Sequence, residues 1–138
     1  MKISARVDNS ESQHHITLTT NDTSHAIVIA PKTTGFGSSA NGGEVLFLAL
    51  ATCYCNDIYR EAAKCSLQVE RVEVEVNGDF GAEGEPAKNV TYRARVHARG
   101  TEADIHALMQ HTDQVVEIQN SLRVEIPVKL GQVDAETM

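Results

Sequence analysis

Alternating apolar and polar side chains mark the first thirty residues of the chain. The runs 3–7 and 16–18 alternate in this way, and residues 26–29 form a largely β-branched stretch. Such alternation is typical of strands with one buried face. Residues rich in Asn, Asp and Ser separate the runs at 8–10 and 21–23, and short turns of this composition join neighbouring strands. The pattern therefore predicts three antiparallel strands.

The longest apolar segment follows a connection rich in glycine and serine over residues 31–43. Residues 45–54 carry no charge, so no face of this segment suits water and other structure must cover it. Farther along, apolar residues recur at helical spacing while charged ones fall between them. The pattern predicts a long helix from Gly42 or Gly43 to Cys65, with an apolar first half and an amphipathic second half.

Two more strands are predicted after this helix. Valines alternate with charged residues over 67–76, and a second alternating run covers 90–96. The apolar positions change from odd to even numbers near Glu70, as a β-bulge allows. The intervening segment 78–86 is rich in glycine and acidic residues and predicts a turn.

The pattern then returns to helical spacing. Thr101 precedes an acidic first turn, which is typical of a helix start, and the helix is predicted to extend toward Asn120 with a break near Thr112. A final strand is predicted over 122–130, where Pro127 suits an edge position. The order is three strands, helix, two strands, helix, strand. We therefore expect an α+β fold in which an antiparallel sheet wraps around a long central hydrophobic helix.

Length and charge narrow the class of protein. A chain of 138 residues suits one domain, residues 1–138, with its own core. Its formal charge of -7, without a basic cluster, predicts repulsion of nucleic acid and of anionic membranes. The first six residues lack the apolar core of a signal peptide, and the apolar run is too short to span a bilayer. We expect a cytoplasmic protein with neither nucleic acid nor membrane as partner.

All three cysteines, Cys53, Cys55 and Cys65, fall within the predicted long helix. Cys55 lies about 200° around the helix from Cys53, so these two thiols cannot pair within it. Reduced thiols are expected. Cys53 has two interpretations: a small apolar side chain packed in a helix interface, or a protected reactive sulfur.

Two other patterns in the sequence match known cofactor and metal motifs only in part, so we expect neither a cofactor nor a metal. Residues 35–40 match the dinucleotide-binding pattern G-x-G-x-x-A, but that pattern works only in a tight turn between a strand and a helix. Here the glycines are separated from both elements, so we interpret them as an entrance loop. His106 and His111 are five residues apart, not the four that bring two imidazoles onto one helix face, and the cysteines lack a second pair.

The start of the long helix carries a family resemblance. The segment Asn41-Gly-Gly-Glu-Val-Leu and the following Ala51-Thr-Cys53 resemble the motif P-x-E-L-L-x-A-A-L-x-x-C of the OsmC-like family, which includes organic hydroperoxide resistance proteins. Glu44 and Cys53 fall on the matching positions. Asn120-Ser121-Leu122 is placed like the end of the family segment C-P-x-S-x-x-L, and the order of elements agrees over nearly the whole chain.

The resemblance implies a thiol peroxidase in which Cys53 attacks a peroxide and a second cysteine resolves the sulfenic acid. Val116 or a neighbour stands where the second cysteine would fall. Gly43 replaces a glutamate that in the hydroperoxide resistance branch orients an arginine beside the thiolate. Arg6 is the only arginine before the helix. An external thiol reductant is therefore expected.

The charges near Cys53 on its own helix oppose a thiolate. Asp57 follows Cys53 at i+4 on the same helix face and favours the neutral thiol. Arg60 is about 10 Å from Cys53 along the helix axis, too far for direct contact within the helix. Glu44 has two interpretations, a functional carboxylate or an acid that stabilises the helix start.

Two hypotheses follow. In the first, the protein is an OsmC-like peroxidase that reduces organic hydroperoxides through Cys53, with Glu44 as the second site residue. In the second, it is a non-catalytic protein of the same fold that binds a hydrophobic small molecule at a dimer interface. Both include an intertwined homodimer, which the family resemblance implies and which would cover the apolar helix.

Overall fold

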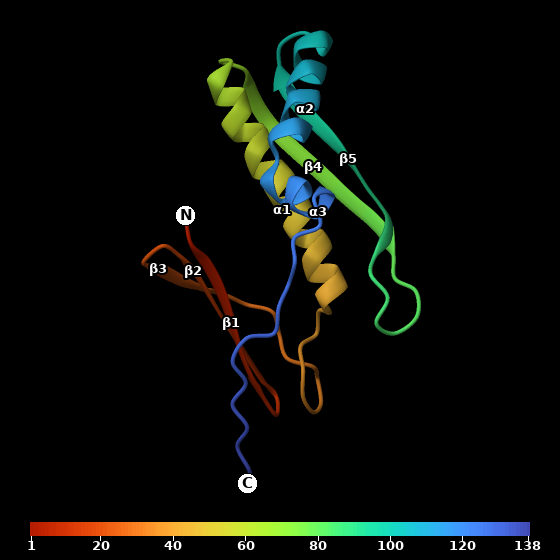
Figure 1. The fold of residues 1–138 in the computed structure, drawn as a ribbon. Helices are drawn as coiled ribbons and strands as arrows, with labels where there is room; N and C mark the ends of the chain where they lie inside the picture. Colours follow the sequence, from red (N-terminus) through yellow and green to blue (C-terminus); the bar gives the residue numbers. More distant parts are fainter. The chain divides into compact units, whose positions relative to one another are not determined.

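The computed structural model describes residues 1–138 and contains three helices and five strands (Figure 1). In chain order these are β1 (Ile3–Ser10), β2 (Gln13–Thr20), β3 (Thr23–Ile27), α1 (Gly42–Lys64), β4 (Gln68–Asp79), β5 (Lys88–Arg99), α2 (Glu102–Val115) and α3 (Glu117–Arg123). All strand pairs are antiparallel, so the predicted α+β class is confirmed. The chain divides into two compact units, residues 1–46 and 47–138. One domain over residues 1–138 stays a prediction.

The first unit holds the three-stranded sheet β1-β2-β3. Strands β1 and β2 pair from Ile3 opposite Thr20 to Ser10 opposite Gln13, so a two-residue turn joins them. Asn21 begins the next turn with a φ of 52°, a left-handed conformation that asparagine adopts at low cost. The three predicted strands are present, but the first turn comes slightly later than the sequence suggested, and the third strand covers Thr23–Ile27 and ends before residues 28 and 29.

The connection from β3 to α1 contains the predicted entrance loop. Gly35 and Gly37 have φ angles of 81° and 95°, values that residues with a Cβ rarely adopt. The helix begins only at Gly42. The two glycines therefore lie in a loop and not in a tight turn between a strand and a helix.

Helix α1 begins with a capping box. The backbone N–H of Glu44 donates to Asn41 Oδ1 at 2.8 Å, and the backbone N–H of Asn41 donates to Glu44 Oε1 at 3.0 Å. These two bonds satisfy donors that a helix start leaves without partners. The helix ends at Lys64, so its predicted bounds are confirmed to within about one residue.

The second unit packs α1 and α2 against one face of the two-stranded sheet β4-β5. The buried cluster consists of Tyr54, Ile58, Ala62, Leu108 and Val116, and inward side chains of both strands pack against it. The register shifts between Val69 and Arg71, which confirms the bulge predicted near Glu70. Most outward residues of the sheet are charged, as is typical of a half-buried strand.

The second helical region is two helices. Thr101 caps α2 by accepting a hydrogen bond from the backbone N–H of Asp104 at 3.1 Å, which confirms the predicted start. The break lies at Val116, whose extended ψ of 111° interrupts the helix, and not near Thr112. Thr112 is fully buried, and its hydroxyl donates to the carbonyl of Leu108, so it stays inside α2.

The predicted strand over 122–130 is absent. Residues 122 and 123 end α3, and residues 124–138 form neither helix nor strand. The alternation that suggested a strand is real, but a strand needs a neighbouring strand to satisfy its backbone groups. This segment pairs with none in the chain.

The uncharged half of α1 is only partly covered by its own chain. Tyr54 is buried, yet the Leu48 side chain is 57% exposed. The expectation that other structure covers every face of this segment is therefore not met within one chain. None of the helices has the length and apolar content needed to cross a bilayer.

Candidate functional site

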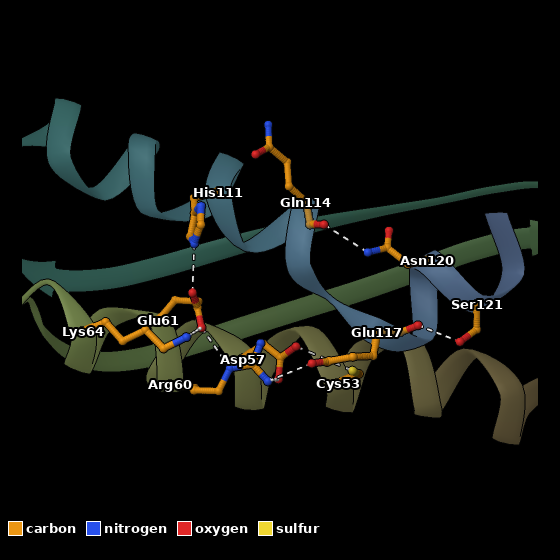
Figure 2. A network of polar contacts seen from close by, with 10 residues as sticks. All are labelled: Cys53, Asp57, Arg60, Glu61, Lys64, His111, Gln114, Glu117, Asn120 and Ser121. Atoms are coloured by element: carbon orange, nitrogen blue, oxygen red, sulfur yellow. Dashed lines mark hydrogen bonds and ion pairs between the residues drawn. The ribbon is translucent and has the colours of Figure 1, made fainter. Parts of the chain in front are cut away.

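Cys53 lies in the middle of α1, where the helix meets α3. Its side chain is half-buried, and none of the three cysteines is paired with another. The Cys53 thiol donates to Asp57 Oδ2 at a Sγ–O distance of 3.9 Å. Figure 2 shows this contact at one end of a polar network that continues along α1. The predicted site cysteine therefore adjoins a carboxylate.

Arg60 joins the carboxylates of two helices. Its Nη1 lies 3.1 Å from Asp57 Oδ1 and 3.2 Å from Oε1 of Glu117, the first residue of α3. Asp57 is only 6% exposed, whereas Glu117 is exposed. The break at Val116 starts a new helix at this point and so places Glu117 beside Cys53 and Asp57. Donor atoms of these three residues lie within 4.8 Å of one another.

The surroundings of Cys53 favour the neutral thiol. Burial raises the pKa of Cys53 most, and the negative charges of Asp57 and Glu117 raise it further. The backbone N–H groups of Ile118 and Glu117 favour the thiolate and lower the pKa in part. On balance the pKa of Cys53 lies above its ordinary value of 9.0. The thiolate is therefore a minor form near neutral pH.

The two carboxyl groups near the sulfur are shifted in opposite directions. Burial and the neighbouring Glu117 raise the pKa of Asp57, although the charge of Arg60 opposes this. The pKa of Glu117 is lowered, first by its own backbone N–H, then by its hydrogen bond with Asp57 and by Arg60. When this pair takes up a proton, Asp57 therefore receives it first.

Glu61 continues the polar network away from the sulfur. Its side chain is 3% exposed and accepts from three cationic or imidazole groups: Arg60 Nε at 2.9 Å, Lys64 Nζ at 2.8 Å and His111 Nε2 at 2.8 Å. The His111 contact links α1 to α2 (Figure 2). The hydrogen bond from Lys64, followed by those from Arg60 and His111, lowers the pKa of Glu61 to about 2.

Glu44 lies in the first turn of α1, nine residues before Cys53. Its carboxylate is engaged in the capping box with Asn41, which is the contact that the helix-start interpretation predicts. Its role as a site residue stays a prediction.

A metal is not assigned to the donors around Cys53. A sulfur and two carboxylates can bind a divalent cation in principle. Here the guanidinium of Arg60 already pairs with both carboxylates, so a cation of the chain compensates part of their negative charge. His106 and His111 take no part in this cluster.

The sequence identified Cys53, Asp57 and Arg60 but did not single out Glu117. Its contact depends on the break at Val116, which puts the first turn of α3 against α1. The only sequence signal was an acidic residue following two valines in a stretch predicted to be helical. That signal does not distinguish a break from a solvated helix face.

The fold and this site together define a small α+β protein with a half-buried cysteine on its longest helix. A family model described as OsmC-like protein matches residues 35–131. The chain belongs to the OsmC-like family, as the motifs around Glu44 and Cys53 suggested. No curated protein sequence matches the chain significantly.

Solved structures of OsmC-like proteins share the fold. The protein from Mycoplasma pneumoniae has 16% identity and a TM-score of 0.59, over 88% of this chain and 86% of its own. A hydroperoxide resistance protein from Jannaschia has 12% identity and a TM-score of 0.57, over 98% and 94%. An organic hydroperoxide resistance protein from Legionella pneumophila has 18% identity and a TM-score of 0.55, over 89% and 90%.

Proposed function

We propose that the protein is a thiol-dependent peroxidase that reduces organic hydroperoxides through Cys53. The observation that carries the proposal is the half-buried position of Cys53 at the family's motif position, where the side chain packs against the edge of the buried core cluster but is not fully enclosed by it. Two structural relatives are named hydroperoxide resistance proteins, which supports the same substrate class. A sulfur with partial access to solvent can meet a small peroxide, whereas a fully packed cysteine cannot.

The reaction has two stages. The sulfur attacks the terminal oxygen of the hydroperoxide, the O–O bond breaks, and an alcohol leaves while Cys53 becomes a sulfenic acid. An external thiol then forms a mixed disulfide with Cys53 and releases water, and a second thiol restores Cys53. Cys55 and Cys65 lie in the same helical region as Cys53 and are not paired with it, and no other cysteine follows them in the sequence. We therefore assign the second stage to an external thiol.

A homodimer is part of the proposal. Three exposed apolar side chains on α1 and α3, Leu48, Ile118 and Leu122, support it, because a second copy could cover them. The free cysteines support a reducing compartment, and we propose the cytoplasm.

The test is hydroperoxide consumption by the reduced protein. With cumene hydroperoxide and excess dithiothreitol, the wild type is expected to turn over and Cys53→Ser to fall to the background rate. Cys65→Ser is the matched control and should keep the wild-type rate, since Cys65 is exposed at the end of α1. Equal rates for the wild type and Cys53→Ser would rule out the peroxidase.

Glu44 is included as the second site residue. Glu44→Gln keeps an oxygen that can accept from the Asn41 backbone N–H but removes the negative charge. A lower rate at an unchanged melting temperature supports a functional carboxylate. A lower melting temperature at an unchanged rate leaves Glu44 as a helix-start residue only.

A second candidate, a non-catalytic protein that binds a hydrophobic small molecule, is favoured by the exposed apolar side chains of α1 and α3 and by the raised pKa of Cys53. Saturable binding of an apolar fluorescent probe, unchanged in Cys53→Ser and without peroxide turnover, would support it. Absence of saturable binding would exclude it.

A further inference from the structure

We propose that Asp57 is the catalytic base that takes the proton from the Cys53 thiol as the sulfur attacks the peroxide. The proposal rests on the proposed function and specifies how its first step proceeds. It assigns Arg60 as the positioning residue that holds the Asp57 carboxylate. Asp57 lies outside the motif that the sequence shares with the family, so the resemblance assigned it no role as a base.

The geometry separates the two oxygens of Asp57. Oδ1 contacts Arg60 Nη1 at 3.1 Å, and Oδ2 accepts from the Cys53 thiol at 3.9 Å. Because the two residues are four apart on α1, their side chains lie on the same helix face. The guanidinium therefore fixes the carboxylate while the second oxygen stays directed at the sulfur. A group that already receives the hydrogen bond from the thiol is placed to receive its proton.

The charged groups around Asp57 come from two helices. On α1 they are Arg60 and Glu61, and on α3 there is Glu117. Glu61 is itself compensated by Arg60, Lys64 and, from α2, His111. Glu117 shares the single Arg60 guanidinium with Asp57.

Burial and this like charge increase the proton affinity of Asp57. A general base works best when its pKa is raised toward the pH at which it acts. An exposed aspartate is a weak base for a thiol, and the buried position of Asp57 makes it a stronger base than an exposed aspartate. A thiol that is mostly neutral at rest also gains the most from a base that acts during the attack.

Protons and electrons balance in this step. The proton moves from Cys53 Sγ to Asp57 Oδ2 while a bond forms between sulfur and the terminal peroxide oxygen. That oxygen keeps its hydrogen and becomes the sulfenic acid hydroxyl. The O–O bond breaks, and the departing alkoxide takes the proton from Asp57 and leaves as the alcohol. Sulfur loses two electrons, the peroxide gains them, and Asp57 returns to its starting form.

Asp57→Asn tests the proposal because two explanations predict opposite results. If Asp57 is only a negative charge near the sulfur, its removal lowers the pKa of Cys53 and speeds the peroxide reaction at neutral pH. If Asp57 is the base, the reaction at neutral pH slows by about a hundredfold, at the low end of general-base effects. In strong alkali the thiol is ionised without help, so the two rates should converge.

The measurement is the single-turnover rate of Cys53 oxidation by cumene hydroperoxide as a function of pH. The wild-type profile is expected to lose rate in acid as Asp57 becomes protonated, and Asp57→Asn should lack this acid limb. Asp57→Glu keeps a carboxylate and should recover part of the neutral rate. Glu75→Gln, which alters an exposed carboxylate on β4, is the matched control and should match the wild type.

A neutral rate in Asp57→Asn equal to or above the wild type would overturn the base assignment while the peroxidase stands. No Cys53-dependent oxidation in the wild type at any pH would instead remove the proposed function. If Asp57→Asn does not fold, Glu117→Gln decides. Loss of the neighbouring charge lowers the proton affinity of Asp57, so the acid limb must move to lower pH, and an unmoved limb overturns the proposal.

Discussion

His111 Nε2 lies 2.8 Å from Glu61 Oε1 and is the link from α2 into the ion-pair network of α1. The Glu61 side chain is almost completely buried, and its carboxylate also accepts hydrogen bonds from Arg60 and Lys64. A buried carboxylate is tolerated only when its oxygens are paired in this way. The His111 contact therefore ties α2 to a buried charge that two cations of α1 already compensate.

Glu61→Gln should lower the melting temperature at neutral pH, because Arg60 and Lys64 lose their shared partner. The pKa of Glu61 is lowered to about 2 in the folded protein from an ordinary value of 4.5. The carboxylate therefore contributes its full stability above about pH 4.5, and this is lost as the pH falls through the folded value. Circular dichroism melts across this range should show the two proteins converging in acid. A constant difference at every pH would contradict this account.

Ile58→Ala should be a costly truncation on α1. Ile58 is fully buried in the cluster with Tyr54 and Leu108, and removing such a side chain costs about 2–5 kcal/mol of unfolding free energy. Denaturant titration of the wild type and the variant measures the difference. Tyr59→Ala is the control on the next, partly exposed position, and an equal loss at both positions would contradict the packing.

Leu48→Glu tests the proposed homodimer. A charge at this exposed apolar position would be buried without a partner if a second copy covers it, so the variant should be monomeric. Sedimentation at several protein concentrations measures the oligomeric state. Ala103→Glu adds the same charge at an exposed position of α2 and should leave the dimer intact. If Leu48→Glu is still a dimer, the interface lies elsewhere on the protein. If the wild type is a monomer, the proposed homodimer is wrong.

Alkylation of Cys53 by iodoacetamide should depend steeply on pH. The raised pKa of the thiol means that the thiolate fraction, and with it the rate, rises about tenfold per pH unit at neutral pH. In a variant with Cys55 and Cys65 replaced by serine, the rate should keep rising past pH 9.0, the ordinary thiol value. A plateau near neutral pH would show a stabilised thiolate and contradict the electrostatics around Asp57 and Glu117.

Features with a local cause were predictable from the sequence. Thr101 and its acidic neighbours fixed the start of α2, and the change of parity near Glu70 located the bulge. The contact of Glu117 with Arg60 was not predictable, because it depends on how two separate helices pack. The same holds for the missing strand over 122–130, since alternation signals a face to bury and not a partner strand.

The bulge at Glu70 has a consequence for comparing this strand with relatives. Val69 and Val72 both lie on the half-buried side, with the two exposed residues Glu70 and Arg71 between them. Without Glu70 the remaining residues would alternate without interruption. A relative that lacks the bulge should therefore be aligned with a single gap at this position. Any other placement would set valines of one protein against surface charges of the other.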